Sequence, residues 1–529
     1  MPAAAVSDAA GTDLRTSQGE VGAGQDRSDD RRSMARSGAV SLAGSLVAAV
    51  GGFALTIIVG RLFGAHLSGL YFQAVAVFMI LNGIAVAGSD TGLVRALSAR
   101  RAVGADRRAW HALTVTLTPV LLWSLVVAAV LAVMADDLAA TFEPADQEVV
   151  RAFLLVLAGT LVASAVGQAA LNGTRSLGSV LPYVVLYQLW LPASRVLAVG
   201  LLAFVDAPAT LLLLTYAVPL VLMDVVAVVY LVRRLRRAAA DAPRLDDEAG
   251  ARRTEAVEVW GFNLPRGVAS CLELAIVWAD VIIVGILLGP AAAGAYAAAS
   301  RFVTTGTMAM EALRLQSAPH LAASWSRGDR DRFVDVYQVT TVWLVLLSWP
   351  LFLGLATWSP LLLGFIGDDF AVAAPALTVL ALGMLVYVAM GNVNSALLMA
   401  GLSGVTAMNT AVALALNVVL NLALVPVLGL VGAAIAWAAC LAIDSILCFV
   451  RGRGRTGVAM PWRPVALAGA SAVVAFGVPG LAVRLLAEPS LVWASAHLVG
   501  GLAVYAVLLH HFRGALGLPA FLPLLRRSS

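Results

Sequence analysis

Long apolar segments recur along this chain of 529 residues, from Ser37 almost to the C-terminus. Each is about 20 residues or longer, the length that a helix needs to cross a bilayer. The chain is 60% hydrophobic and only 12% charged, whereas roughly 25% of the residues in a soluble domain are charged. These features predict an all-α polytopic membrane protein.

The apolar segments predict about fourteen transmembrane helices, arranged as two six-helix lobes and an extra C-terminal pair. The predicted spans are 37–60, 70–89, 110–135, 150–171, 180–204, 209–232, 260–288, 294–319, 333–356, 371–398, 404–427, 430–450, 464–486 and 491–512. The polar N-terminus lacks periodicity, so we expect a disordered tail there. The expected domains are this cytoplasmic tail (1–36), the N-terminal lobe (37–232), a cytoplasmic linker (233–259), the C-terminal lobe (260–450), the extra pair (464–512) and a cytoplasmic tail (513–529).

The arginine residues indicate how the chain is oriented. All 35 basic residues are Arg, and with the predicted spans 28 of them fall on the side of the N-terminus. Only Arg61, Arg151 and Arg484 fall in segments on the other side. Arg-rich loops stay in the cytoplasm, so we expect both termini to be cytoplasmic, in a bacterial cell membrane. The three cysteines lie in apolar segments without metal-ligand spacing, so we expect no disulfide, metal or cofactor.

One block of residues occurs twice, 225 positions apart. The pattern Ile-Ile-Val-Gly-x-Leu-x-Gly-x4-Gly-x-Tyr runs from Ile57 to Tyr71 and again from Ile282 to Tyr296. Both copies end one apolar segment and open the next. Each repeat has six spans, an even number, so both lobes begin on the same side of the membrane. We therefore expect a pseudo-twofold axis along the membrane normal. This construction is typical of transporters.

Several further motifs resemble the polysaccharide flippases of the multidrug/oligosaccharidyl-lipid/polysaccharide (MOP) exporter superfamily. They extend over about residues 37–450. The motifs are Arg-Leu-x-Gly-x4-Gly-x-Tyr at Arg61–Tyr71, Gly-x-Asp-Thr-Gly-Leu-Val-Arg at Gly88–Arg95, Trp278-Ala279-Asp280, Pro319, Asn417–Pro426 and Gly429–Ala436. The resemblance implies transport of an undecaprenyl-pyrophosphate-linked oligosaccharide, or a related polyprenyl-linked sugar, for surface polysaccharide biosynthesis. Asn417 and Asn421 also fit a purely structural role, because they share a helix face and can bond neighbouring helices.

Charged residues inside the predicted spans are the candidate functional residues. A central charge costs about 2.5–3.5 kcal/mol on the insertion scale, so these groups should line a wet cavity or pair with one another. Arg binds phosphate oxygens bidentately, and Gln188 can bind sugar hydroxyls. We therefore interpret Arg195, Arg266, Arg301 and Gln188 as a pyrophosphate and sugar cavity, and Asp224, Glu273, Asp280 and Glu311 as coupling or gating residues.

Two ion pairs are predicted from helical geometry. Asp280 and Arg301 lie at similar depths on adjacent antiparallel helices, so a salt bridge between them is feasible. Such a pair fits a structural role as well as a functional one. Glu311 and Arg314 share a face at i, i+3, where they form either a cytoplasmic gate or an interfacial cluster.

Two other functions compete with the flippase. A multidrug-type exporter of the same superfamily needs a carboxylate in the first lobe, and Asp224 is the only deep one there. A membrane-bound polysaccharide polymerase or ligase needs a catalytic constellation on a sizeable loop, which this chain lacks, so no enzyme activity is expected. The expected mechanism is alternating access between the lobes, with H⁺ or Na⁺ as the candidate coupling ion. The expected partners are the lipid-linked sugar, membrane lipid and other polysaccharide assembly proteins, with no nucleic acid.

Overall fold

The computed structural model describes residues 9–177, 179–205, 207–242, 248–486, 488 and 490–516. Every regular element in these residues is a helix, which confirms the expected fold class. The first half contains α1 (Ala9–Val86), α2 (Ser89–Ala102), α3 (Asp106–Val133), α4 (Ala135–Ala139), α5 (Gln147–Gly173), α6 (Leu181–Tyr183), the π-helix η2 (Val184–Trp190), α7 (Leu191–Phe204) and α8 (Leu214–Asp241).

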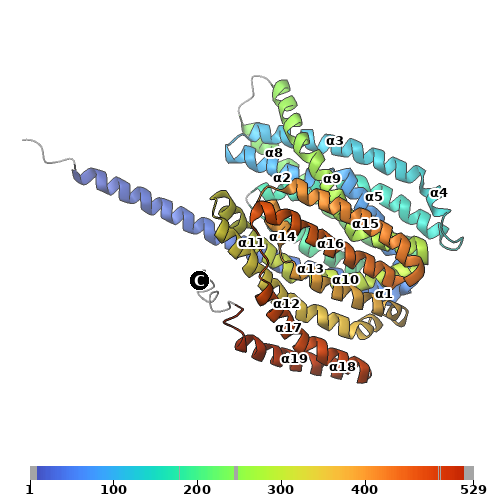
Figure 1. Ribbon diagram of the computed structural model, residues 1–529. Helices are drawn as coiled ribbons and strands as arrows, with labels where there is room; N and C mark the ends of the chain where they lie inside the picture. Colours follow the sequence, from blue (N-terminus) through green and yellow to red (C-terminus); the bar gives the residue numbers. More distant parts are fainter. Residues whose placement is uncertain are drawn as a thin grey trace, which may run out of the picture.

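The second half begins with the longest helix after α1. It contains α9 (Glu248–Leu288), α10 (Pro290–Gly306), α11 (Met308–Ser326), α12 (Arg330–Gly364), η4 (Asp368–Ala373), α13 (Ala374–Ala389), α14 (Val393–Met399), α15 (Ser403–Leu428) and α16 (Leu430–Thr456). The C-terminal pair consists of α17 (Trp462–Ala472), the π-helix η5 (Val473–Gly477), α18 (Val478–Leu486) and α19 (Leu491–His511). This pair packs against α12 at one edge of the bundle (Figure 1).

Twelve stretches of the described residues are long and apolar enough to cross a membrane, so the count of fourteen is not confirmed. The first stretch, Ala43–Arg101, holds both of the first two predicted spans, because α1 continues through a kink at Gly64. The span predicted at 294–319 is divided between α10 and α11 and is not among the twelve.

The N-terminal tail expected to be disordered is helical where the structure describes it, and so is most of the predicted linker. The tail predicted as disordered at 1–36 belongs to α1 from Ala9 onward, and residues 1–8 lie outside the described part. Residues 9–36 contain no Pro, so nothing interrupts a helix that continues outward from the first apolar segment. Most of the linker predicted at 233–259 is also helical, because α8 extends to Asp241 and α9 begins at Glu248. These extensions are rich in Ala, Arg and Glu, which favour helices.

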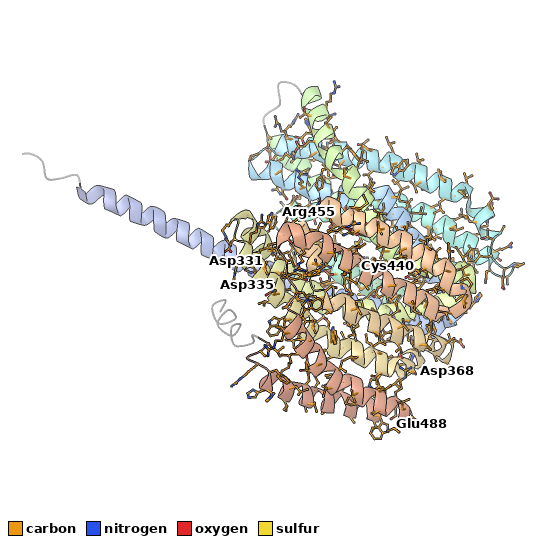
Figure 2. The ribbon with its side chains drawn as sticks, in the orientation of Figure 1. Asp331, Asp335, Asp368, Cys440, Arg455 and Glu488 are labelled. Carbon is orange, nitrogen blue, oxygen red and sulfur yellow. The ribbon has the colours of Figure 1, made fainter. Side chains whose placement is uncertain are left out.

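The bundle has two ends, named here for their connections. The linker end carries the end of α8, the start of α9, the outward extension of α1 and the end of α19 (Figure 1). The hairpin end carries the kink at Gly64 and the turn at Gly289. In Figure 2, Asp331 and Arg455 lie at the linker end, Asp368 lies at the hairpin end, and Cys440 lies between them.

The two halves share one hydrophobic core. The core cluster contains Val59 and Tyr71 of α1 together with their repeat counterparts Val284 and Tyr296 of α9 and α10. All four side chains are at most 3% exposed. The helices that carry the repeated block therefore lie at the contact between the two halves.

Candidate functional site

The two copies of the repeated block pack against each other at the hairpin end. A β-carbon on Gly69 would overlap the carbonyl oxygen of Pro290 and lie 3.0 Å from the backbone nitrogen of Gly294. A β-carbon on Gly294 would in turn overlap the carbonyl oxygen of Ala65. We call this contact between Ala65, Gly69, Pro290 and Gly294 the hairpin seam. It requires glycine because the two backbones approach too closely for any side chain.

A second contact closes the bundle toward the linker end, where the junction of α1 and α2 meets α9. The backbone at Ala87 and Gly88 lies directly against Asn263 and Gly267, with no room for a β-carbon on either glycine. The Asn263 Nδ2 donates a hydrogen bond to the Ser89 Oγ at 3.1 Å. Ala87 itself has a positive φ of 48°, which shows how tightly the chain turns there.

Charged and aromatic groups continue this contact along α2. The Arg100 guanidinium bonds the Glu255 carboxylate at 2.8 Å and the Glu258 carboxylate at 2.5 Å. The side chains of Arg100 and Glu255 are only 11% and 6% exposed, whereas that of Glu258 is 56% exposed. The Arg95 guanidinium lies 4.4 Å from the ring centroid of Phe262. We call this second contact, from Ala87 to Arg100 on one side and from Glu255 to Gly267 on the other, the linker seam.

A small cavity lies between the two seams. It is bordered by α1, α9, α10, α13 and α16, and its polar lining includes Asp280, Arg301, Ser300 and Thr304. Its volume is about 60 Å³, and one water occupies roughly 30 Å³ in the liquid. In this conformation, which we call occluded, both seams are closed and the cavity between them has room for only a few waters.

Two of the predicted arginines, one from each half, converge on a pair of tyrosines. The guanidinium of Arg195 on α7 lies 3.6 Å from the ring centroid of Tyr216. Tyr216 packs edge-on against Tyr71 of α1, with their ring centroids 6.4 Å apart. Arg195 and Arg301 both interact electrostatically with the hydroxyls of Tyr71 and Tyr216, and also with each other.

Arg301 also contacts an aromatic ring of its own half. Its guanidinium lies 4.8 Å from the ring centroid of Trp278 on α9. In the described residues neither Arg195 nor Arg301 forms a salt bridge with a carboxylate. Aromatic faces hold a guanidinium in place while leaving its N–H groups able to bind an anion.

The salt bridge predicted between Asp280 and Arg301 does not form, although both residues line the same cavity. The Asp280 carboxylate instead accepts hydrogen bonds from the Asn421 Nδ2 at 2.8 Å and the Tyr296 hydroxyl at 3.3 Å. The Asn421 Nδ2 also donates to the carbonyl oxygen of Asn417 at 2.9 Å. The prediction was wrong because depth along two helices does not fix which way their side chains rotate. Of the two asparagines that the sequence left between a structural and a functional role, Asn421 therefore holds this carboxylate and Asn417 bonds Asn421.

Two further pairs that include predicted site residues each lie within one helix, and of these only Glu311–Arg314 was predicted as a pair. Arg266 bonds Glu273, two turns along α9, at 3.2 Å. Arg314 bonds Glu311 at 2.8 Å, at the predicted i, i+3 spacing. Of the three predicted arginines, only Arg301 lines the cavity between the seams, and only Arg195 and Arg301 share the tyrosine pair.

Gln188 lies in the π-helix of the fifth predicted span and is 6% exposed. Its Nε2 donates to the Ser45 Oγ at 2.8 Å, and its side chain packs directly over Gly44. The irregular turn precedes Pro192, which lacks the N–H that a regular helix would use there. In this conformation Gln188 therefore joins α1 to η2 and does not line the central cavity.

Asp224 on α8 is a deeply buried carboxylate in the first half. It is 1% exposed, and neither of its oxygens has a hydrogen-bond partner in the described residues. Its side chain packs against Gly167 of α5, where a β-carbon would collide with the carboxylate. An unpartnered buried carboxylate is costly when ionised, so this position fits a group that takes up a proton or a cation.

Sequence reasoning missed Arg100, Glu255 and Glu258 of the linker seam and the Tyr71–Tyr216 pair. Arg100 lies in an Arg-rich segment that was interpreted only as an orientation signal, and the two glutamates lie in the predicted linker. Opposite charges on two segments at one membrane face were the available signal. Tyr71 closes the first copy of the repeated block, but nothing in the sequence pairs it with Tyr216.

Comparisons with known proteins agree with this architecture. Residues 265–424 match the family model MatE. A Haloferax volcanii protein described as "Probable low-salt glycan biosynthesis flippase Agl15" is 30% identical over 174 residues, which are 32% of this chain and 36% of that protein. The match thus spans little more than a third of that relative's length.

Solved structures match over most of the chain. The lipid II flippase MurJ in an inward closed conformation superposes with a TM-score of 0.70 at 12% identity, covering 89% of this chain and 98% of that one. An inward-facing multidrug resistance MATE family transporter of the MOP superfamily gives a TM-score of 0.59 at 14% identity, covering 78% and 94% of the two chains.

The chain is thus a multi-pass membrane protein of two packed helical halves, with the fold that the lipid II flippase and the MATE transporters share. Together with the MatE match over residues 265–424 and the partial identity to a glycan flippase, this fold supports the resemblance to the MOP exporter superfamily noted in the sequence.

Proposed function

We propose that this protein flips a pyrophosphate-linked oligosaccharide on a polyprenyl lipid, such as undecaprenyl, across the cell membrane. One observation carries the proposal: Arg195 and Arg301 reach the same tyrosine pair from opposite halves, and neither forms a salt bridge with a carboxylate in the described residues, although Asp224 is close enough to Arg195 to interact with it electrostatically. Two guanidinium groups at the junction of two moving halves suit a phosphate-bearing headgroup. The fold similarity to a lipid II flippase and the partial identity to a glycan flippase support the same substrate class.

Alternating access assigns each seam a role. With the arginine-rich linker end in the cytoplasm, opening of the linker seam would admit the headgroup and opening of the hairpin seam would release it outside. The lipid tail would stay in the bilayer while the headgroup crosses between the halves. Arg266 and Gln188, which lie outside the closed cavity, would contact the substrate only in the open states.

Asp224 and Asp280 are the proposed coupling sites for H⁺ or Na⁺. Asp224 is buried without a hydrogen-bond partner in the described residues and interacts electrostatically with Arg195, and Asp280 combines a buried carboxylate with the amide of Asn421. Glu273 and Glu311, each paired with an arginine on its own helix, are proposed to adjust gating. Binding of a cation at either aspartate would change the charge balance beside the arginines and so bias one seam to open.

The test replaces Arg301 with Ala and with Lys, and Arg195 with Ala, in cells that depend on this protein. We expect lipid-linked sugar to accumulate on the cytoplasmic side in both Ala variants, with at least tenfold less surface polysaccharide. Arg301→Lys should recover part of the activity, because it keeps the charge but loses the bidentate geometry. Arg453→Ala, which removes an exposed arginine at the linker end, is the matched control. Normal surface polysaccharide in Arg301→Ala and Arg195→Ala cells, at normal protein levels, would refute the proposal.

Export of organic cations is the second candidate, because a carboxylate, Asp280, lines the central cavity beside Arg301. The fold similarity to multidrug MATE transporters is compatible with it. Efflux of a fluorescent cation from vesicles separates the two functions. Efflux that depends on Asp280 and persists in Arg301→Ala would favour the exporter.

A further inference from the structure

A groove runs along the outer face of α8 at the linker end. It has a volume of about 480 Å³ and is lined by Val225, Val226, Val229, Tyr230, Arg233, Arg234 and Arg237. The three valines are 38–51% exposed, so they face away from the core. The opposite face of the helix carries buried residues such as Asp224, Ala227 and Leu231. The groove is therefore a surface feature, separate from the central cavity.

The groove has the dimensions of one membrane leaflet. From Val225 to Arg237 the helix rises about 18 Å at 1.5 Å per residue. Half the hydrocarbon thickness of a bilayer is about 15 Å. An apolar wall thus extends through one leaflet and ends in three arginines at the level of the headgroups.

The three arginines are available to a ligand. All three are exposed, and none forms an ion pair in the described residues. Arg233 and Arg237 lie four residues apart on one face of α8, with Arg234 beside them, so their guanidinium groups border one site. Tyr230 separates the apolar wall from the arginines, where an amphipathic ring favours the interface.

We propose that this groove binds an anionic phospholipid of the leaflet at the linker end. Its phosphate would bind Arg233, Arg234 and Arg237, and one acyl chain would lie along Val225, Val226 and Val229. A basic cluster at the end of an apolar groove is the pattern that recognises such lipids. The chemistry is that of a resident lipid and not of the transported one, because the groove faces away from both seams. A bound lipid here would hold the first half in the membrane while the halves move.

The experiment measures lipids retained by the purified full-length protein in native mass spectrometry, from nanodiscs of equal parts phosphatidylglycerol and phosphatidylcholine. We expect the unmodified protein to retain phosphatidylglycerol preferentially. The triple variant Arg233→Gln, Arg234→Gln, Arg237→Gln should retain about tenfold less. The triple variant Arg453→Gln, Arg455→Gln, Arg463→Gln removes the same charge elsewhere and should keep the lipid. A second test, Val226→Trp, fills the groove without changing charge and should also displace the lipid.

Three results would overturn the proposal. Equal retention of phosphatidylcholine, whose headgroup has no net charge, would show that the groove does not select for a negatively charged headgroup. An equal loss in the control triple variant would show a general charge effect and no site. Displacement of phosphatidylglycerol by added polyprenyl pyrophosphate would assign the groove to the transported substrate. None of these readouts depends on transport, so the result stands apart from the proposed function.

Discussion

The hairpin seam and the linker seam close the same cavity from opposite ends, but by different chemistry. The hairpin seam is two backbones in van der Waals contact through Gly69 and Gly294, and the repeat makes it nearly symmetric. The linker seam adds an ionic contact from Arg100 to two glutamates and a cation–π contact from Arg95. Beside the hairpin seam, Arg61 also donates to the Phe365 carbonyl oxygen of the other half, and its guanidinium lies 4.3 Å from that residue's ring centroid. Of the two seams, the linker seam alone joins the halves through a salt bridge in the described residues.

The difference indicates how each seam opens. Two closely packed backbones lose their dispersion contacts as soon as they separate, so a partly open hairpin seam keeps little of that stabilisation. Charged groups at a surface lose their partners with a smaller net change in free energy, because water replaces those partners. We infer that the linker seam opens gradually and responds to charge, whereas the hairpin seam opens in one step.

One assay can test both seams. A cysteine at Ser300, in the central cavity, reports access when the native Cys271, Cys440 and Cys448 are replaced by Ala. A membrane-impermeant maleimide added from the hairpin side or the linker side shows which seam has opened. Low labelling from both sides is the expected starting point for the occluded protein.

Gly69→Ala should have the largest effect. The new β-carbon meets the backbone of Pro290, which cannot move aside, so we expect a cost of about 3 kcal/mol for the closed hairpin seam. Labelling from the hairpin side should rise by roughly two orders of magnitude. Gly52→Ala, in the same helix and with open space at its β-carbon, is the control. Unchanged labelling in Gly69→Ala would show that the close glycine packing does not close the hairpin end.

Arg100→Ala should have the next largest effect, on the other side. It leaves the largely buried Glu255 carboxylate unpaired, at a cost of about 2 kcal/mol. We expect labelling from the linker side to rise about 30-fold. The exchange Arg100→Glu with Glu255→Arg should restore much of the closure. If the exchange labels as strongly as Arg100→Ala, the two side chains do not interact across the seam.

Phe262→Leu removes the cation–π contact with Arg95 and keeps an apolar side chain. Because Arg95 is exposed, we expect a loss of about 0.5 kcal/mol and a roughly twofold rise in labelling from the linker side. In a protein that already carries Arg95→Gln, Phe262→Leu should cause no further rise in labelling. An effect as large as that of Arg100→Ala would show that the cation–π contact stabilises the closed linker seam as much as the salt bridge does.

Glu258→Gln should have the smallest effect. Its carboxylate is 56% exposed, and exposed ion pairs contribute roughly 0–1 kcal/mol. We expect a change of less than twofold in labelling, which should vanish at 0.5 M salt because exposed charges are screened. Glu255→Gln at the same salt concentration should keep its larger effect. Equal effects of the two variants would contradict the difference in burial.

The fold and the position of the hairpin seam could be predicted from the sequence, but the partners of the site residues could not. The lengths of the apolar segments predict the helices. The glycines of the repeated block mark the two turns that pack against each other at the hairpin end. The prediction for Asp280 failed because three groups, Arg301, Asn421 and Tyr296, all lie within reach of it, and only packing selects between them. The helical extensions into the linker were not predicted, because residues outside the membrane can extend a helix without any apolar signal.

The sequence alone determined that this chain crosses a membrane many times and that its two halves are related, since both follow from apolar length and from repetition along the chain. Only the tertiary structure decided that Arg195 and Arg301 meet at one tyrosine pair while Arg266 remains with Glu273. Contacts between side chains depend on how each helix is rotated about its axis and on which helices pack side by side. The pattern of apolar residues along the sequence specifies neither of these.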